Sequence, residues 1–88
     1  MNLEFRASFI KDLRRIKGKK LKAEIRETII LIEKAINLQG IKGIKKLKGS
    51  EQYYRIRISD YRIGLSVQGN TVTFVRFLHR KDVYRYFP

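Results

Sequence analysis

The fold is decided by one stretch, Tyr53-Tyr-Arg-Ile-Arg-Ile-Ser-Asp-Tyr-Arg-Ile-Gly-Leu-Ser-Val67, in which apolar and polar side chains alternate. Strict alternation predicts β-strands with one apolar face, because successive side chains point to opposite sides of a sheet. The other face of these strands then carries Arg55, Arg57 and Arg62. Like charges held side by side repel each other, so the pattern favours a surface that binds an anion such as phosphate.

The composition describes one small basic domain. The chain has 88 residues, and 21 Lys and Arg against 8 Asp and Glu give a formal net charge of +13. Such a charge favours nucleic acid, an acidic protein or anionic lipid as the partner. The absence of cysteine excludes disulfides and cysteine-based zinc sites. Neither a signal peptide nor an apolar run of membrane-spanning length is apparent, so we expect a soluble cytoplasmic protein without membrane contact.

Two helices are predicted in the first half of the chain. Alternation in residues 3–5 indicates a short strand that precedes them. The first helix has Ser8 as its expected N-cap, and Gly18 ends its pattern. The second helix is expected from about Lys19 to Leu38, because isoleucine and leucine recur along one side of it.

The second half of the chain is expected to form a meander of strands near residues 53–59, 61–68 and 71–79. Two-residue turns at Ser59-Asp60 and Gly69-Asn70 would join them, and a brief strand is expected near residues 44–47. The whole of residues 1–88 is therefore predicted to be one α+β domain. Its antiparallel sheet would have about four strands, plus the N-terminal strand, with two helices packed on one face.

The expected register assigns side chains to the two faces of the sheet. Arg57 stands opposite Arg62, and Gly64 leaves open space beside the cations. Continued through the second turn without interruption, the register places Phe77 opposite Arg62 and adds His79 to the same face. On the core side it places Val72, Phe74, Arg76 and Leu78.

On this face His79 alone has a side chain whose ordinary pKa suits proton transfer near neutrality. Metal-free RNA cleavage must deprotonate the 2′-hydroxyl, stabilise charge on the phosphoryl oxygens and protonate the departing 5′-oxygen. Arginine binds phosphate bidentately but is a poor base. His79 is therefore predicted to be the base or the acid. The alternatives are a hydrogen-bonded structural histidine and an arginine row that is only a solvated surface.

The C-terminal segment adds an aromatic side chain to the basic residues. If its last residues form a helical turn, Tyr84 and Arg80 lie over the basic face, where Tyr84 would stack on an RNA base. The alternative is that the aromatic residues of the tail simply anchor it to the core. Lys45, Lys46 and Lys48 form a basic run that would bind or steer RNA, or only keep the protein soluble.

The order of these parts resembles the RelE/ParE superfamily of bacterial and archaeal toxins. The most specific pieces are Ser59-Asp-Tyr-Arg-Ile63 and the ending His79-Arg-Lys-Asp-Val-Tyr84, and the resemblance extends over nearly the whole chain. It implies a microbial-ribonuclease-like sheet and the toxin of a type II toxin–antitoxin pair. RelE-type members enter the ribosomal A site and cut mRNA there, with a 2′-hydroxyl of the RNA as the internal nucleophile. The resemblance therefore implies an endoribonuclease with neither metal nor cofactor.

Carried over residue by residue, the resemblance implies roles at the site. Arg62 and Arg80 match the phosphate-binding arginines of the family, and Tyr84 matches the tyrosine that positions the codon base. His79 lies where several relatives have a histidine. The residues so implied as catalytic are Arg55, Arg57, Arg62, His79, Arg80 and Tyr84.

One departure from the family pattern concerns Arg55 and Arg57, because RelE-like enzymes often carry lysine there. Arginine weakens any scheme with a lysine base and places more weight on His79. The expected partners are a cognate acidic antitoxin, the 70S ribosome and mRNA, and the toxin alone is expected to be a monomer. Two alternatives stay open: a ParE-like inhibitor of DNA gyrase with the same fold, and a module that binds RNA without cutting it.

Overall fold

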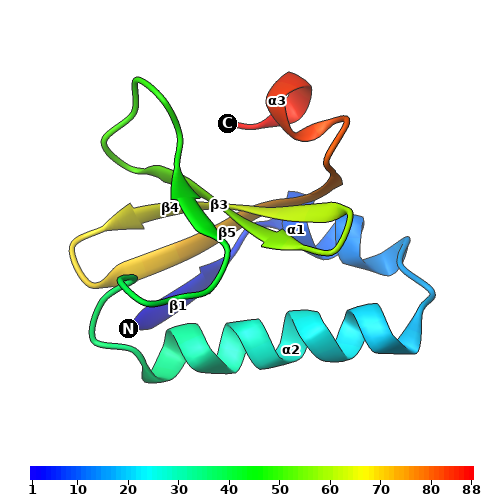
Figure 1. The fold of residues 1–88 in the computed structure, drawn as a ribbon, viewed down its shortest axis with the longest axis horizontal. Helices are drawn as coiled ribbons and strands as arrows, with labels where there is room; N and C mark the ends of the chain where they lie inside the picture. The colour runs from blue at the N-terminus through cyan, green and yellow to red at the C-terminus, as the bar shows by residue number, and fades with distance from the viewer.

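The computed structural model describes residues 1–88 without a gap and contains a five-stranded sheet (Figure 1). Its strands are β1 (Asn2–Phe5), β2 (Ile44–Lys46), β3 (Tyr53–Ile58), β4 (Tyr61–Gln68) and β5 (Thr71–His79). Its helices are α1 (Ala7–Arg14), α2 (Lys19–Lys34) and α3 (Val83–Tyr86). The strand order is β1-β5-β4-β3-β2, with β1 parallel to β5 and every other pair antiparallel. The predicted α+β class and the additional N-terminal strand are confirmed.

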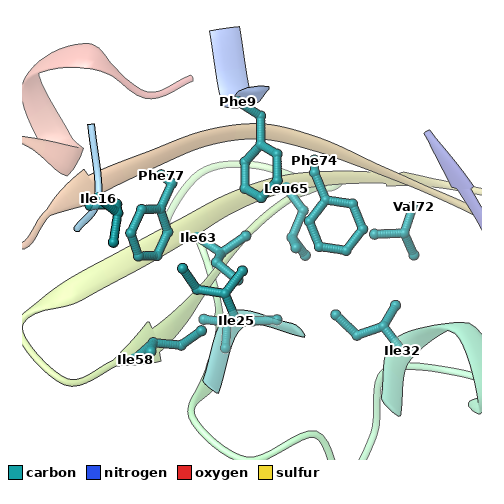
Figure 2. Packing of buried hydrophobic residues seen from close by; sticks show 11 residues of the cluster. Phe9, Ile16, Ile25, Ile32, Ile58, Ile63, Leu65, Val72, Phe74 and Phe77 are labelled. Atoms are coloured by element: carbon teal, nitrogen blue, oxygen red, sulfur yellow. The ribbon is translucent and has the colours of Figure 1, made fainter. Parts of the chain in front are cut away.

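The apolar face of the sheet is covered by α1, α2 and the connection between them (Figure 2). The rings of Phe9 and Phe74 pack with their centroids 5.3 Å apart, which joins α1 to β5. Each fully buried side chain of this kind stabilises the fold by about 1.5–3 kcal/mol. The cluster consists of Phe9, Ile16, Ile25, Ile32, Ile56, Ile58, Ile63, Leu65, Val72, Phe74 and Phe77.

The second helix is shorter than its apolar pattern predicted. It ends at Lys34, four residues before Leu38, because Ala35 already has an extended backbone. The ammonium group of Met1 donates hydrogen bonds to the carbonyl oxygens of Glu33 at 2.8 Å and Ala35 at 3.0 Å. These carbonyls at the end of α2 are therefore satisfied by the chain terminus. No helix of the structure has the length and apolar character needed to cross a membrane.

Ser8 does not cap α1, contrary to the prediction. Arg6 occupies the N-cap position and makes no side-chain capping bond. The Ser8 hydroxyl donates instead to the carbonyl oxygen of Val75, at 2.6 Å. Because β1 pairs with β5 only as far as Phe74, the outer edge of β5 beyond that residue is open, and α1 supplies its hydrogen-bond partners.

A β-bulge changes the predicted register of β4 and β5. The two strands pair as predicted up to Leu65 opposite Phe74, and the register then shifts between Gly64 and Leu65. Phe77 consequently faces Ile63 in the core, so its predicted place opposite Arg62 is wrong. Leu78 takes that place, and Arg76 stands opposite Gly64, so both lie on the face away from the core rather than on the predicted core side.

Contacts to α1 account for the bulge. The Asp12 carboxylate accepts hydrogen bonds from the Phe77 backbone N–H at 2.9 Å and from Arg76 Nε at 2.8 Å. Asp12 and Ser8 therefore occupy the free edge of β5 in place of another strand. A bulge adds one residue on one strand and shifts every following side chain to the opposite face. Here the shift buries Phe77, whose side chain is 3% exposed.

Candidate nucleic-acid interface

Four arginines and a tyrosine meet on the face of the sheet that α1 and α2 leave uncovered. Arg57 on β3 and Arg62 on β4 are cross-strand partners, and Arg55 lies two residues before Arg57 on the same face. The tail after β5 contributes Arg80 and Tyr84. The Cζ atom of Arg55 lies 5.7 Å from the ring centroid of Tyr84, in a cation–π arrangement. We call these five residues the arginine face, and their predicted proximity is confirmed.

The arginine face opposes its own positive charge. Burial lowers the pKa of Arg62, and the charges of Arg55, Arg57 and Arg80 lower it further, while Tyr84 acts in the opposite direction. Acidic side chains do not relieve this repulsion, because both ion pairs of the structure lie elsewhere, between Lys46 and Glu51 and between Asp12 and Arg76. An anion bound among the arginines would lower the free energy of the charged state.

The turn between β3 and β4 organises two of these arginines. Nη1 of Arg62 donates hydrogen bonds to the carbonyl oxygens of Tyr61 at 2.8 Å and Ser59 at 3.1 Å. The carbonyl of Asp60 accepts from the backbone N–H of Arg80 at 2.8 Å. Ser59 has a φ of 55°, an uncommon conformation for a residue other than glycine. The turn therefore fixes the Arg62 guanidinium and the start of the tail at one place.

The C-terminal tail fills the space that was predicted to stay open at Gly64. A Cβ atom on Gly64 would lie 2.7 Å from the ring of Phe87, so the phenylalanine occupies the position of the missing side chain. Phe87 and Val83 are 3% and 1% exposed, and the Phe87 ring packs edge-on against Tyr53. Tyr84 is 69% exposed. The tail is thus anchored by some of its apolar residues, while Tyr84 presents its ring to solvent beside the arginines.

His79 lies on the helix side of the sheet, so its predicted place among the arginines is wrong. Beyond the bulge its cross-strand partner is Tyr61, and the two rings pack edge to face with centroids 5.4 Å apart. Tyr61 itself stacks on the core residue Phe77. Nδ1 of His79 accepts a hydrogen bond from the backbone N–H of Lys81 at 3.2 Å. These contacts match the structural alternative for this histidine.

The three lysines predicted to bind RNA lie in different places. Lys45 is opposite Arg55 in the β2–β3 pair and extends the arginine face by one strand. Lys46 points to the other side of the sheet, and its ammonium group lies 3.2 Å from the carboxylate of Glu51. Lys48 is exposed in the loop that follows β2. Only Lys45 is aligned with the arginines by strand register.

Contacts that position the tail were missed by the sequence analysis. Asp12 forms a bidentate pair with Arg76 and raises its pKa, chiefly through the hydrogen bond. The Cζ atom of Arg76 lies 6.0 Å from the ring centroid of Tyr86 in α3. The available signal was Gly64, because a glycine inside a strand often marks the close approach of another segment. His, Cys, Asp and Glu side chains form no group of three or more that is placed to hold a metal ion.

The structure thus has two helices on one face of the sheet, and the arginine face beside the C-terminal tail on the other. Residues 3–84 match the family model described as the ParE toxin of the type II toxin–antitoxin system parDE. The chain therefore belongs to the RelE/ParE superfamily of type II toxins.

Two of the similar proteins are named RelE toxins. The chain is 44% identical to Toxin RelE3 of Methanocaldococcus jannaschii over the full length of both chains. It also matches a chain in the crystal structure of the RelB–RelE antitoxin–toxin complex from Methanococcus jannaschii, with 41% identity, a TM-score of 0.83 and coverage of 97% and 99%. The YoeB dimer from Staphylococcus aureus, at 24% identity and a TM-score of 0.73 over 90% and 95% of the chains, shares the fold.

Proposed function

We propose that this toxin is an endoribonuclease that cuts mRNA in the ribosomal A site and so inhibits translation. The observation that carries the proposal is the arginine face, where guanidinium groups without an acidic partner surround Arg62 beside the exposed ring of Tyr84. A phosphodiester flanked by an unstacked base fits both features. Aromatic stacking holds a base, and arginine forks bind phosphate oxygens bidentately.

In the proposed reaction the 2′-oxygen attacks the adjacent phosphorus and the bond from phosphorus to the 5′-oxygen breaks. The products are a 2′,3′-cyclic phosphate and a 5′-hydroxyl. Negative charge builds up on the phosphoryl oxygens in the transition state, where preorganised cations are most effective. Arg62 is held by backbone carbonyls through Nη1, which leaves its other N–H groups for the phosphate. Arg57 and Arg80 flank it and add charge.

Tyr84 would hold the base next to the reacting phosphate. Its ring is exposed on one side and lies near Arg55 on the other, so a base that stacks on it joins an existing cation–π pair. Stacking of this kind contributes about 1–3 kcal/mol per base. Orienting the base also orients the ribose, and the rate of internal attack depends on that alignment.

Proton transfer is the part of the proposal that differs from the sequence-based expectation. The arginine face contains arginine and tyrosine only, and His79 packs on the other side of the sheet. We therefore assign to the protein the stabilisation of charge and the orientation of the RNA. The 2′-hydroxyl proton passes to solvent or to a ribosomal group, and the departing 5′-oxygen takes a proton from solvent. Arg55 and Arg57 stay charged and cannot act as the base.

A cognate acidic antitoxin would neutralise this toxin in the cytoplasm, and the toxin alone would be a monomer. Antitoxin complexes are known for relatives, including RelB–RelE from Methanococcus jannaschii and RelE–RelB from Pyrococcus horikoshii. A net charge of +13 supports an acidic partner and also an encounter with ribosomal RNA. The 70S ribosome would present the mRNA to the arginine face.

End-mapping of mRNA after addition of the protein to a translating ribosome system tests the proposal. We expect cuts within codons, and we expect the double variant Arg62→Ala with Arg80→Ala to cut at least about 100-fold more slowly, by analogy with the loss of an oxyanion-stabilising donor. Circular dichroism must show that the double variant is folded. Unchanged cleavage by the folded double variant would exclude the arginine face as the site. Tight ribosome binding with no cuts by the wild-type protein would indicate a binding module.

Inhibition of DNA gyrase is the second candidate, because the matching family model is that of ParE. The discriminating measurement is DNA supercoiling by purified gyrase in the presence of the toxin. Inhibition of supercoiling together with intact mRNA would assign the chain to the ParE activity. Cuts in mRNA with unaffected supercoiling would assign it to the RelE activity.

A further inference from the structure

A row of three residues crosses the middle of the uncovered face of the sheet. Arg55 on β3, Gly64 on β4 and Arg76 on β5 are direct cross-strand partners. Neighbouring strands lie about 4.8 Å apart, so the two arginines of the row are separated by about 10 Å. The tail lies over this row with α3, across the sheet from α2 (Figure 1). The row is therefore the surface on which α3 rests.

Each member of the row has one aromatic side chain of the tail above it. The ring centroid of Tyr84 lies 5.7 Å from Cζ of Arg55, and that of Tyr86 lies 6.0 Å from Cζ of Arg76. The Phe87 ring fills the space above the glycine between them. Because α3 is a single turn of four residues, it does not keep its shape without tertiary contacts. The three aromatic contacts therefore fix where α3 lies on the sheet.

The two arginines of the row differ in what holds them. Asp12 is nearly buried and accepts hydrogen bonds from Nε of Arg76 at 2.8 Å and from Nη2 at 3.2 Å. A bidentate pair holds the guanidinium by its edge and leaves its flat faces free to contact a ring. Arg55 belongs to no ion pair of the structure and is free to meet an anion. One end of the row is thus fixed by α1, and the other end is open to a ligand.

We propose that Asp12 and Arg76 are positioning residues of the RNA-cleaving site. Their ion pair holds the ring of Tyr86, and through it α3, so that the ring of Tyr84 lies where a base can stack on it. With about 3.6 residues per turn, side chains two positions apart point to roughly opposite sides of a helix. A contact that holds Tyr86 therefore limits the rotation of α3 that would move Tyr84 away from Arg55. The inference rests on the proposed function, because the step that it affects is the orientation of the base.

Steady-state cleavage of mRNA on ribosomes tests this role, with Arg76→Met as the main variant. Methionine is unbranched and apolar, so it neither pairs with Asp12 nor attracts the ring of Tyr86. We expect kcat to fall about tenfold because Tyr84 loses its alignment, and KM to change less than about twofold because the arginine face stays intact. Lys81→Met removes a charge of the tail that belongs to neither ion pair, and it should change kcat less than about twofold.

A double substitution tests whether Arg76 acts through Tyr84. In a chain that already has Tyr84→Ala, Arg76→Met should lower kcat by less than about a further twofold, because no ring remains to be positioned. Arg76→Met leaves the carboxylate of Asp12 without its cation, so circular dichroism must show that this variant is folded. Tyr86→Leu replaces it if it is not, since Tyr86→Leu leaves the ion pair in place and should lower kcat by a similar factor.

A spectroscopic measurement follows the tail without any cleavage. The chain contains no tryptophan, so Tyr84→Trp introduces a single fluorescent reporter at the end of the row. Its fluorescence anisotropy should fall when Arg76→Met is added, because the ring gains freedom, and should stay the same when Lys81→Met is added. If the wild-type chain cuts no mRNA while the anisotropy still falls in this way, the positioning of the tail stands and the nuclease proposal fails.

Three results would overturn the inference. The first is an unchanged kcat in folded Arg76→Met or, in its place, in Tyr86→Leu. The second is an equal loss of kcat from Arg76→Met with and without Tyr84→Ala, because the effect would then not pass through the Tyr84 ring. The third is a fluorescence anisotropy of Tyr84→Trp that Arg76→Met leaves unchanged.

Discussion

On the helix side of β3 and β4, Ile56 and Ile63 face each other and are 1% and 0% exposed, whereas on the other side Arg57 and Arg62 face each other without an acidic partner. The same two strands therefore carry one pair that stabilises the fold and one that opposes it. Burial of the isoleucines is complete without any ligand. The arginine pair reaches its most favourable state only when an anion lies beside it.

This difference separates stability from function across the thickness of a single sheet. Alternating residues of a strand have independent surroundings, so a change on one face leaves the other face in place. The repulsion among the arginines is a cost that the apolar core offsets. Sites that bind ligands are commonly less stable than the scaffold that holds them. The following substitutions test the separation.

The largest expected effect is on stability, at Ile63. Ile63→Ala removes a fully buried side chain and should lower the free energy of unfolding by about 2–5 kcal/mol, because a cavity remains between the sheet and the helices. Chemical denaturation measures this loss. The substitution Arg62→Gln at the neighbouring position should leave stability within about 1 kcal/mol of wild type while slowing mRNA cleavage by about 100-fold. A large loss of stability in Arg62→Gln would show that the two faces are not independent.

The second prediction concerns the contact between the tail and Gly64. Gly64→Ala places a methyl group where the Phe87 ring lies and should cost about 1–3 kcal/mol, because the ring must move. Digestion with trypsin should then reach Arg85 faster. The matched control is Gly18→Ala, where the nearest atom lies 3.9 Å from the new Cβ. If the ring is responsible, Gly64→Ala combined with Phe87→Ala will cost less than the sum of the two single changes.

A smaller effect, of opposite sign, is expected from removing one of the repelling charges. Burial lowers the pKa of Arg62, and the neighbouring charges, Arg57 among them, lower it further. The folded protein therefore holds the proton of the Arg62 guanidinium less tightly than an unfolded chain would. Arg57→Gln should therefore raise Tm at low ionic strength, by no more than about 4 °C, and the gain should vanish in about 1 M salt. Lys48→Gln, an exposed lysine in a loop, is the control. A lower Tm for Arg57→Gln would contradict repulsion within the arginine face.

The smallest effect is expected at His79. His79→Gln should change the cleavage rate less than about threefold, because the ring lies across the sheet from the arginines, whereas loss of a positioned acid or base costs about 100-fold or more. The pH profile of cleavage should be the same for His79→Gln as for the wild-type protein. A rate loss of about 100-fold with normal ribosome binding would return His79 to the chemistry.

The hairpin of β3 and β4 could be predicted from the sequence because its information is local. Alternation with period two assigns each residue to a face, and a two-residue turn at Ser59-Asp60 fixes the register, so Arg57 opposite Arg62 followed directly. The apolar side of the sheet was likewise evident from the isoleucines. The proximity of Arg80 and Tyr84 came from the tail directly following β5 and from the resemblance to a known family.

The tertiary structure alone decided which face of the sheet carries His79 and where the tail ends. The bulge in β5 depends on Ser8 and Asp12, whose hydrogen-bond partners on β5 lie 67 and 65 residues away along the chain. One added residue reverses every later side chain, so an error at that point moved His79 to the wrong face. The packing of Phe87 on Gly64 also joins two segments, 23 positions apart in the sequence. Local periodicity therefore determined the two faces, and long-range contacts at a strand edge decided which residues of the last strand belong to each.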